Sequence, residues 1–221
     1  MEIDAVQQIS VTGVDVFTAV HDRHQDGSEA LVARRYGARG YSNTQLSTRN
    51  EAALTVCSAR QGESIVGTIA VRFDSEAGFN AESTFAEEIK QLREQGHNLC
   101  EFSRLAVDED LIDSKKVLAQ LFHLAYLHGH RLAGCGTLII EVNPRHVAFY
   151  RRLLGFEVRC ESRMNWRVSA PAVLLTLDLR RASEMIAMYG GCPELAASTR
   201  TLYPYFYGTE EEVEIIGRLR Q

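Results

Sequence analysis

The sequence contains no uninterrupted apolar run of the ~18 residues that a membrane-spanning helix requires. Two of its most apolar segments, Thr137 to Ile140 and Ala172 to Leu175, have only the length of a strand. The first residues, Met-Glu-Ile-Asp, lack the basic and apolar regions of a secretory signal. We therefore expect no transmembrane segment and a cytoplasmic location.

Long basic tracts are also missing. The 24 Lys and Arg residues are outnumbered by 29 Asp and Glu residues, which gives a net charge of -5. A chain with this balance has no general attraction to nucleic acid, so we expect no nucleic-acid partner. The basic residues form short pairs that are typical of solvated surface but can dock an acidic partner locally: Arg34-Arg35, Lys115-Lys116, Arg151-Arg152 and Arg180-Arg181.

The sequence offers little for a disulfide framework or a metal centre. Its five cysteines are widely spaced and include no Cys-x-x-Cys pair, so we expect reduced thiols. His123, His128 and His130 lie close together, but no carboxylate or Cys stands at ligand spacing. We expect no metal site and interpret these histidines as partly exposed helix residues. Ser103 is not in a Gly-x-Ser-x-Gly turn, which argues against a hydrolase nucleophile.

The composition is that of an ordinary globular protein. The chain has 221 residues, of which 45% are hydrophobic and 24% charged, and only four are prolines. No linker divides it. We predict a single domain over residues 1–221, with a core at about 14–180 and a C-terminal helical extension at about 181–221.

Hydrophobic periodicity predicts an α/β fold. Runs rich in β-branched residues, Ala53 to Ala59 and Ser64 to Phe73, flank Gln61-Gly62-Glu63 and predict an antiparallel hairpin. Further strands are predicted at residues 98–107, 137–142, 156–160 and 173–179. Helical spacing predicts one or two helices within 14–36, interrupted near Asp26-Gly27, then helices at 75–95, 116–133 and 210–220. Such an order predicts a mixed sheet covered by helices on both faces.

The segment Asn143-Pro-Arg-His-Val-Ala-Phe-Tyr150-Arg-Arg-Leu-Leu-Gly155-Phe156 resembles the closing motif of the GNAT N-acyltransferase superfamily. The resemblance implies a GNAT-like, mostly antiparallel central sheet. It also implies that Tyr150 protonates the departing thiolate of a thioester donor, although Tyr150 or Phe149 can instead be a core residue. Asn143 ends the strand before Pro144, where it can bind a pantetheine arm or simply cap the turn.

Glu101 is the best candidate for accepting the proton of an attacking amine. It interrupts an otherwise apolar strand, where a buried carboxylate needs a partner, and Arg104 follows three residues later. Strict alternation places the two on opposite faces, so their pairing requires a bulge or a neighbouring element. A purely structural ion pair at a strand end is the alternative.

A second resemblance is more specific. Val66-Gly-Thr-Ile-Ala-Val-Arg72, a helix, and then Glu101-Phe-Ser-Arg104-Leu-Ala-Val107 is similar to the acyl-homoserine lactone (autoinducer) synthases and the related FeeM-type N-acyl amino acid synthases. Lactone synthases have an N-terminal Trp and paired Asp residues before the hairpin. Here the only Trp is Trp166, and Tyr41 to Asn50 contains no Asp, which favours the N-acyl amino acid branch.

The donor is expected to be an acyl-carrier protein. Most GNAT enzymes that use coenzyme A have a glycine-containing loop whose N–H groups bind the pyrophosphate. The corresponding segment here, Asp108 to Val117, contains no glycine. Lys115 and Lys116 are candidates for docking the acidic carrier. Acyl-CoA stays the alternative donor, and no permanently bound cofactor is expected.

These observations predict a long-chain N-acyltransferase that moves a fatty acyl group from acyl-carrier protein to the α-amine of an amino acid. Glu101, Arg104 and Tyr150 are the expected catalytic residues. The expected substrate-binding residues are Arg39, Arg72, Ser103, Leu105, Ala106, Val107, Asn143 and Phe149; the backbone of Leu105 to Val107 would bind the oxyanion, and Arg39, Arg72 or Arg104 the acceptor carboxylate. The alternatives are an acetyl-CoA-dependent acetyltransferase, a lactone synthase, and a catalytically silent module that binds an acyl ligand.

Overall fold

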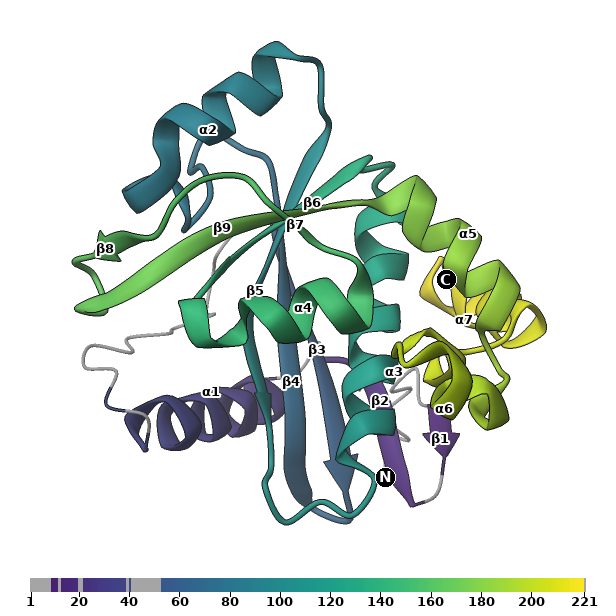
Figure 1. The fold of residues 1–221 in the computed structure, drawn as a ribbon. Coiled ribbons are helices and arrows are strands. Elements are labelled where there is room, and N and C mark those ends of the chain that lie inside the picture. The colour runs from purple at the N-terminus through teal and green to yellow at the C-terminus, as the bar shows by residue number, and fades with distance from the viewer. Residues whose placement is uncertain (1–8, 12, 20–21, 39, 41–52, 221) are drawn as a thin grey trace.

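A single sheet lies at the centre of the computed structural model, which describes residues 9–11, 13–19, 22–38, 40 and 53–220 (Figure 1). The strands are β1 (Ile9–Val11), β2 (Val14–Thr18), β3 (Leu54–Gln61), β4 (Ser64–Phe73), β5 (Leu99–Val107), β6 (Thr137–Val142), β7 (Glu157–Val158), β8 (Arg163–Asn165) and β9 (Ala170–Asp178). The α-helices are α1 (Asp22–Gly37), α2 (Glu82–Glu94), α3 (Ser114–Tyr126), α4 (Val147–Leu154), α5 (Leu179–Tyr189), α6 (Ala196–Thr199) and α7 (Thr209–Leu219). A π-helical segment, η1 (Leu127–Leu132), continues α3, and η2 (Pro144–His146), η3 (Pro193–Leu195) and η4 (Tyr203–Tyr205) are 3-10 turns.

The strand order is β1-β2-β3-β4-β5-β6-β9-β7, with β8 also paired to β9. Among the described pairs, β5 and β6 are parallel and the others antiparallel. The predicted mixed, mostly antiparallel sheet is therefore confirmed. The predicted hairpin is β3 and β4, in which Gln61 pairs with Ser64 and Gly62 takes the positive φ of 58° that the tight turn requires.

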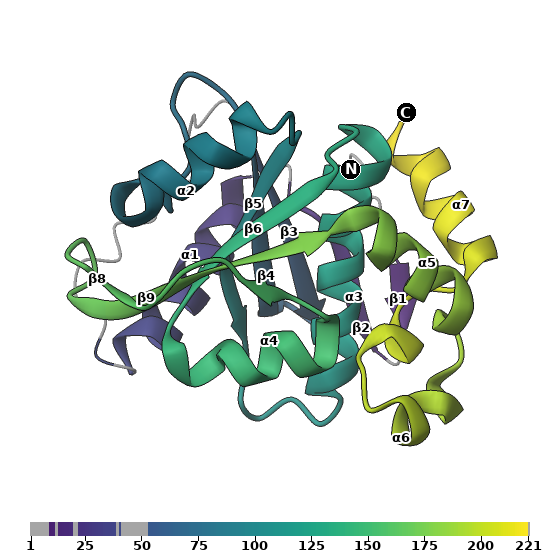
Figure 2. The same cartoon turned by 45° about the horizontal axis from the view of Figure 1, so that its top comes forward.

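Helices cover both faces of the sheet, as expected. On one face, α3, α4, α5 and the C-terminal segment pack on a large apolar cluster that includes Cys100, Phe102 and Ile140. On the other face, α2 buries Phe85, Ile89 and Leu92 against a cluster with Leu99, and α1 packs on Ala106. Figure 2 shows α2 and α5 on opposite sides of the strands.

The sheet opens between β5 and β6. These strands pair only from Leu99↔Thr137 to Glu101↔Ile139, and β5 then runs on along β4. The β4–β5 register shifts opposite Thr68 and Ala70, and Arg104 has a φ of 55° at this irregularity. A bulge changes the direction of a strand, so β5 and β6 separate beyond Glu101.

The prediction of one or two helices within residues 14–36, interrupted near Asp26-Gly27, is partly wrong. Val14–Thr18 is a strand, β2, whose buried Val14, Val16 and Phe17 lie in the sheet and not on a helix. Helix α1 then runs without interruption through Asp26 and Gly27. Gly27 marks a close approach, because a Cβ there would lie 2.7 Å from Cγ1 of Ile65. Gly27 therefore lets α1 pack closely against Ile65 and does not break the helix.

Other boundaries also differ from expectation. The helix predicted at 75–95 begins only at Glu82, and the strand predicted at 156–160 is reduced to Glu157–Val158. Strands β1 and β8 were not predicted, and helix α5 (Leu179–Tyr189) falls mostly within the helical extension predicted at about 181–221, although no separate helix was predicted for these residues. The predicted helix at 116–133 is α3 with its π-helical continuation. None of the described helices has the length and apolarity needed to cross a bilayer.

The C-terminal segment joins the main core through Leu202, Phe206 and Ile215. Its polar anchor is His123, which is fully buried, so the expectation of partial exposure is wrong for this histidine. Its Nδ1 accepts the Tyr207 N–H at 3.0 Å, which leaves Nε2 to donate to Glu212 at 3.1 Å. This pair of contacts fixes the neutral tautomer.

Candidate active site

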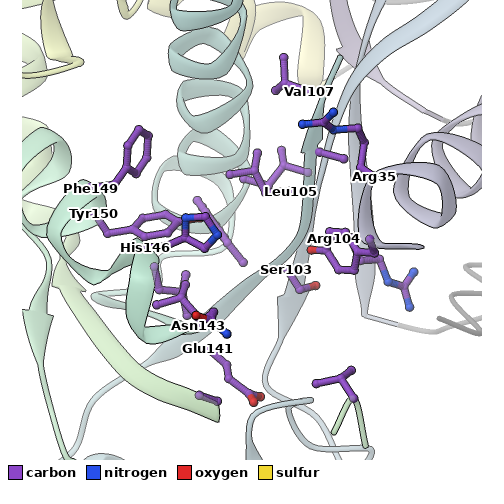
Figure 3. A pocket seen from close by; sticks show the side chains of 18 of the residues that line it. Arg35, Ser103, Arg104, Leu105, Val107, Glu141, Asn143, His146, Phe149 and Tyr150 are labelled. Atoms are coloured by element: carbon purple, nitrogen blue, oxygen red, sulfur yellow. The ribbon is translucent and has the colours of Figure 1, made fainter. Parts of the chain in front are cut away.

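A cavity of about 670 Å³ fills the gap between β5 and β6 (Figure 3). Its walls come from β5, β6, the starts of α3 and α4, the β8–β9 hairpin, and Asn80. Ten residues predicted from the sequence line it: Glu101, Ser103, Arg104, Leu105, Ala106, Val107, Lys115, Asn143, Phe149 and Tyr150.

The cavity connects the two faces of the sheet. Side chains alternate along a strand, so Phe102 and Ile140 point to the main core while Glu101 and Glu141 point to the face that carries α2. The cavity wall includes all four of these residues. One end is therefore aromatic and apolar, and the other end carries two carboxylates.

Glu101 is only 1% exposed and is held at the start of the α2 segment. Its carboxylate accepts the N–H of Asn80 at 2.8 Å and that of Ala81 at 2.9 Å. Burial raises the pKa of Glu101 to about 7, against the opposing effect of these hydrogen bonds and of Arg72. A carboxylate with such a pKa can take up and release a proton at neutral pH.

The expected ion pair between Glu101 and Arg104 is replaced by another. Arg72, directly opposite Glu101 on β4, has its Nε 3.9 Å from the Glu101 carboxylate. Cross-strand neighbours share a face, whereas Arg104 lies at the bulge, three residues further along β5. The expected strand irregularity is present, but it redirects Arg104 to the cavity wall and not to Glu101.

Tyr150 stands at the aromatic end of the cavity. Its ring lies 6.2 Å from that of Phe122, 5.3 Å from Phe149 and 5.6 Å from Phe156, measured between centroids. His146 also lines the cavity. Tyr150 is half-buried, so it both packs on the core and lines the cavity.

Asn143 caps the turn that follows β6. Its Oδ1 accepts the N–H of Arg145 at 3.1 Å, so the capping interpretation is confirmed. Across the gap, the β5 edge from Ser103 to Val107 has no strand partner among the described residues on the β6 side. Backbone N–H groups on such an edge can bind the oxygen atoms of a ligand.

The loop between β5 and α3 is acidic and is tied to α1. Asp108 accepts a hydrogen bond from Arg34 at 2.6 Å, and Glu109 pairs with Arg35. Lys115, exposed in the first turn of α3, also lines the cavity. Arg72 lies opposite Glu101 and does not line the cavity. Lys116 follows Lys115 at the start of α3, where a docking role was predicted, and Arg39 lies outside the described residues.

Sequence reasoning missed three polar residues at the carboxylate end. Glu141 is half-buried on β6, its Oε1 accepts a hydrogen bond from Asn165, and Arg167 lies 4.0 Å from its Oε2. Burial raises the pKa of Glu141. The available signal was the interruption of apolar β6 by a carboxylate, as at Glu101. Asn165 and Arg167 had no such signal, because β8 was not predicted.

The gap between a parallel pair of strands, with titratable groups at one end and a tyrosine at the other, is the arrangement expected of an acyltransferase with a GNAT-like fold. Residues 28–178 match the family described as N-acyl amino acid synthase FeeM. The chain belongs to this family, which confirms the resemblance noted in its sequence.

Solved structures agree with this assignment. FeeM, an N-acyl amino acid synthase from uncultured soil microbes, is 25% identical with a TM-score of 0.70, over 77% of this chain and 93% of FeeM. An acyl-CoA N-acyltransferase from Pseudomonas aeruginosa (10% identity, 74% and 97% covered, TM-score 0.53) shares the fold. So does BjaI, a CoA-dependent acyl-homoserine lactone synthase (12% identity, 81% and 82% covered, TM-score 0.53). No curated protein sequence matches this chain.

Proposed function

We propose that this N-acyltransferase transfers a long fatty acyl group from acyl-carrier protein to the α-amine of an amino acid, in the cytoplasm. The observation that carries this proposal is the cavity through the sheet. Its apolar end, lined by Phe102, Leu118 and Phe122, suits an acyl thioester, and its carboxylate end suits an amine.

The reaction is a direct attack in a ternary complex. The acceptor ammonium loses one proton to Glu101, directly or through water, and its nitrogen attacks the thioester carbonyl. The backbone amides of Leu105 to Val107 stabilise the oxyanion, with Ser103 and Arg104 in the same wall. The C–S bond then breaks, Tyr150 protonates the thiolate, and the nitrogen's second proton restores Tyr150. One proton is released to water for each amide formed.

The β5–α3 loop favours a carrier protein over coenzyme A. The loop carries Asp108, Glu109, Asp110 and Asp113 at the position where a pyrophosphate would otherwise be bound, and it has no glycine. Two phosphates placed beside these carboxylates would be repelled. A phosphopantetheine carries a single phosphate, which Lys115 and Lys116 can meet at the start of α3.

Competition between donors tests the proposal. Purified protein receives a mixture of amino acids with either acyl-carrier protein or coenzyme A bearing the same long acyl chain, and N-acyl products are measured by mass spectrometry. We expect the carrier thioester to be the better substrate. Reversing the charge of Lys115 and Lys116 (Lys→Glu) should raise the KM of the acyl-carrier protein by about 10-fold. The turnover of acyl-pantetheine should not change. Faster transfer from acyl-CoA would contradict the donor assignment.

A further inference from the structure

The carboxylate end of the cavity contains a connected set of polar side chains. Asn165 donates from Nδ2 to Glu141, and its Oδ1 accepts the N–H of Arg167 at 2.8 Å. The Arg167 guanidinium donates from Nη1 to Asn80 at 3.1 Å. Because the N–H of Asn80 also binds Glu101, the set leads directly to the proposed proton acceptor.

Glu141 and Arg167 each have hydrogen-bonding capacity that a ligand could use. Oε1 of Glu141 has Asn165 as its donor, whereas the buried Oε2 has no hydrogen-bond partner among the described residues and only the charge of Arg167 at 4.0 Å. A buried carboxylate oxygen without a donor is costly and readily accepts one from a ligand. The Arg167 side chain is 47% exposed, so its guanidinium has N–H groups that a ligand can reach.

We propose that Glu141 and Arg167 form the acceptor subsite and select α-amino acids, with Glu141 binding the ammonium group and Arg167 the carboxylate. This inference rests on the proposed function and replaces Arg39, Arg72 and Arg104 as the expected carboxylate ligands. An α-amino acid carries one cation and one anion on the same carbon, which matches one carboxylate and one guanidinium side by side. Asn165 is a positioning residue, since it holds both partners.

The fold explains why the subsite lies here. Glu141 follows Ile139 on the same face of β6, and Ile139 is paired with Glu101, so the acceptor's amine would reach the cavity beside Glu101. The β8–β9 hairpin brings Asn165 and Arg167 over this point, with Asn165 paired to Ala170. An amine held there faces the gap through which the thioester enters from the aromatic end.

The test compares each amino acid that the wild-type protein acylates with the amine that lacks its carboxyl group. Arg167→Met should raise the KM of the amino acid by about 10- to 100-fold, the loss expected for hydrogen bonds between charged groups. It should leave the KM of the amine unchanged. Glu141→Gln should raise the KM of both substrates, because both carry the ammonium group.

Arg163→Met is the matched control. Arg163 lies on the same hairpin and binds Glu88 of α2, so it also anchors the hairpin, but it is not in the cavity wall. We expect its kinetics to equal those of the wild-type protein. The proposed subsite would be wrong if Arg167→Met raised the KM of the amino acid and of the amine equally, or if it left the KM of the amino acid unchanged. If the wild-type protein acylated no amino acid at all, the proposed function would fail, and the subsite with it.

Discussion

Glu101 illustrates how a single position serves both the fold and the chemistry. Its two oxygens accept backbone N–H groups that begin the α2 segment, and Arg72 stands opposite. These contacts would ordinarily lower the pKa of a carboxylate, yet burial outweighs them and raises it to about 7. The structural interpretation of Glu101 and the catalytic one are therefore compatible, because the same burial produces both.

The pKa of Glu101 predicts the pH profile of the enzyme. Below about pH 7 Glu101 is protonated and cannot accept a proton, so kcat/KM should rise as the pH increases through about 7. Glu101→Gln should lose this limb of the profile and lower turnover by ~100-fold or more. Initial rates across the pH range, with circular dichroism as a check on folding, provide the measurement. A limb at pH 7 that persists in the variant would remove Glu101 from the mechanism.

At the residue scale, the sequence predicted what local pattern can show. Glu101 stood out because a carboxylate in an apolar strand is unusual, and Tyr150 because of its motif. The predicted partner of Glu101, Arg104, was wrong. The observed partner, Arg72, becomes a neighbour of Glu101 only when β4 and β5 pair. Arg167 was missed because its position depends on a hairpin of only three paired residues.

Among the elements, α7 is held by a buried carboxylate, Glu212, in addition to its apolar packing. Glu212 accepts hydrogen bonds from His123 at 3.1 Å and from Arg131 at 2.7 Å, and thereby joins α7 to α3 and η1. Burial alone would raise the pKa of Glu212, but His123 and Arg131 outweigh it and lower the pKa. The carboxylate thus stays charged between its two donors.

Glu212→Gln should weaken this attachment. The amide offers one acceptor where two donors converge, and leaving a buried donor without a partner costs about 1–3 kcal/mol. Urea unfolding at neutral pH measures the change. Glu214→Gln is the control, because Glu214 lies on the same helix but is exposed and forms a surface ion pair with Arg218, at 3.4 Å; we expect a change within about 0.5 kcal/mol. Equal losses in both variants would contradict the buried network as the anchor.

The helices and strands also show which elements a sequence pattern can predict and which it cannot. Long periodic segments such as α3 and β4 were predicted well, because burial on one face imposes a clear spacing. Strand β2 was interpreted as helix because five residues are too few to separate the two periods. Gly27 suggested a break in the helix, but the structure shows that it lies against Ile65, where there is no room for a side chain.

At the scale of the whole molecule, the active site is a consequence of incomplete strand pairing. Three residue pairs join β5 to β6, and beyond them the sheet holds a cavity of about 670 Å³. The α/β class and the sheet with helices on both faces could be predicted from the sequence. The opening that connects the two faces could not, because it depends on the relative directions of two strands and on the bulge at Arg104.

The most direct measurement is mass spectrometry of organic extracts from a bacterial host that expresses the wild-type chain, the Glu101→Gln variant or the Arg163→Met control. We predict long-chain N-acyl amino acids in extracts of the wild-type and Arg163→Met hosts, and their absence or strong reduction with Glu101→Gln at equal soluble expression. The masses would identify both the acyl chain and the acceptor. Extracts without any new N-acyl amino acid, despite well-expressed folded protein, would contradict the account.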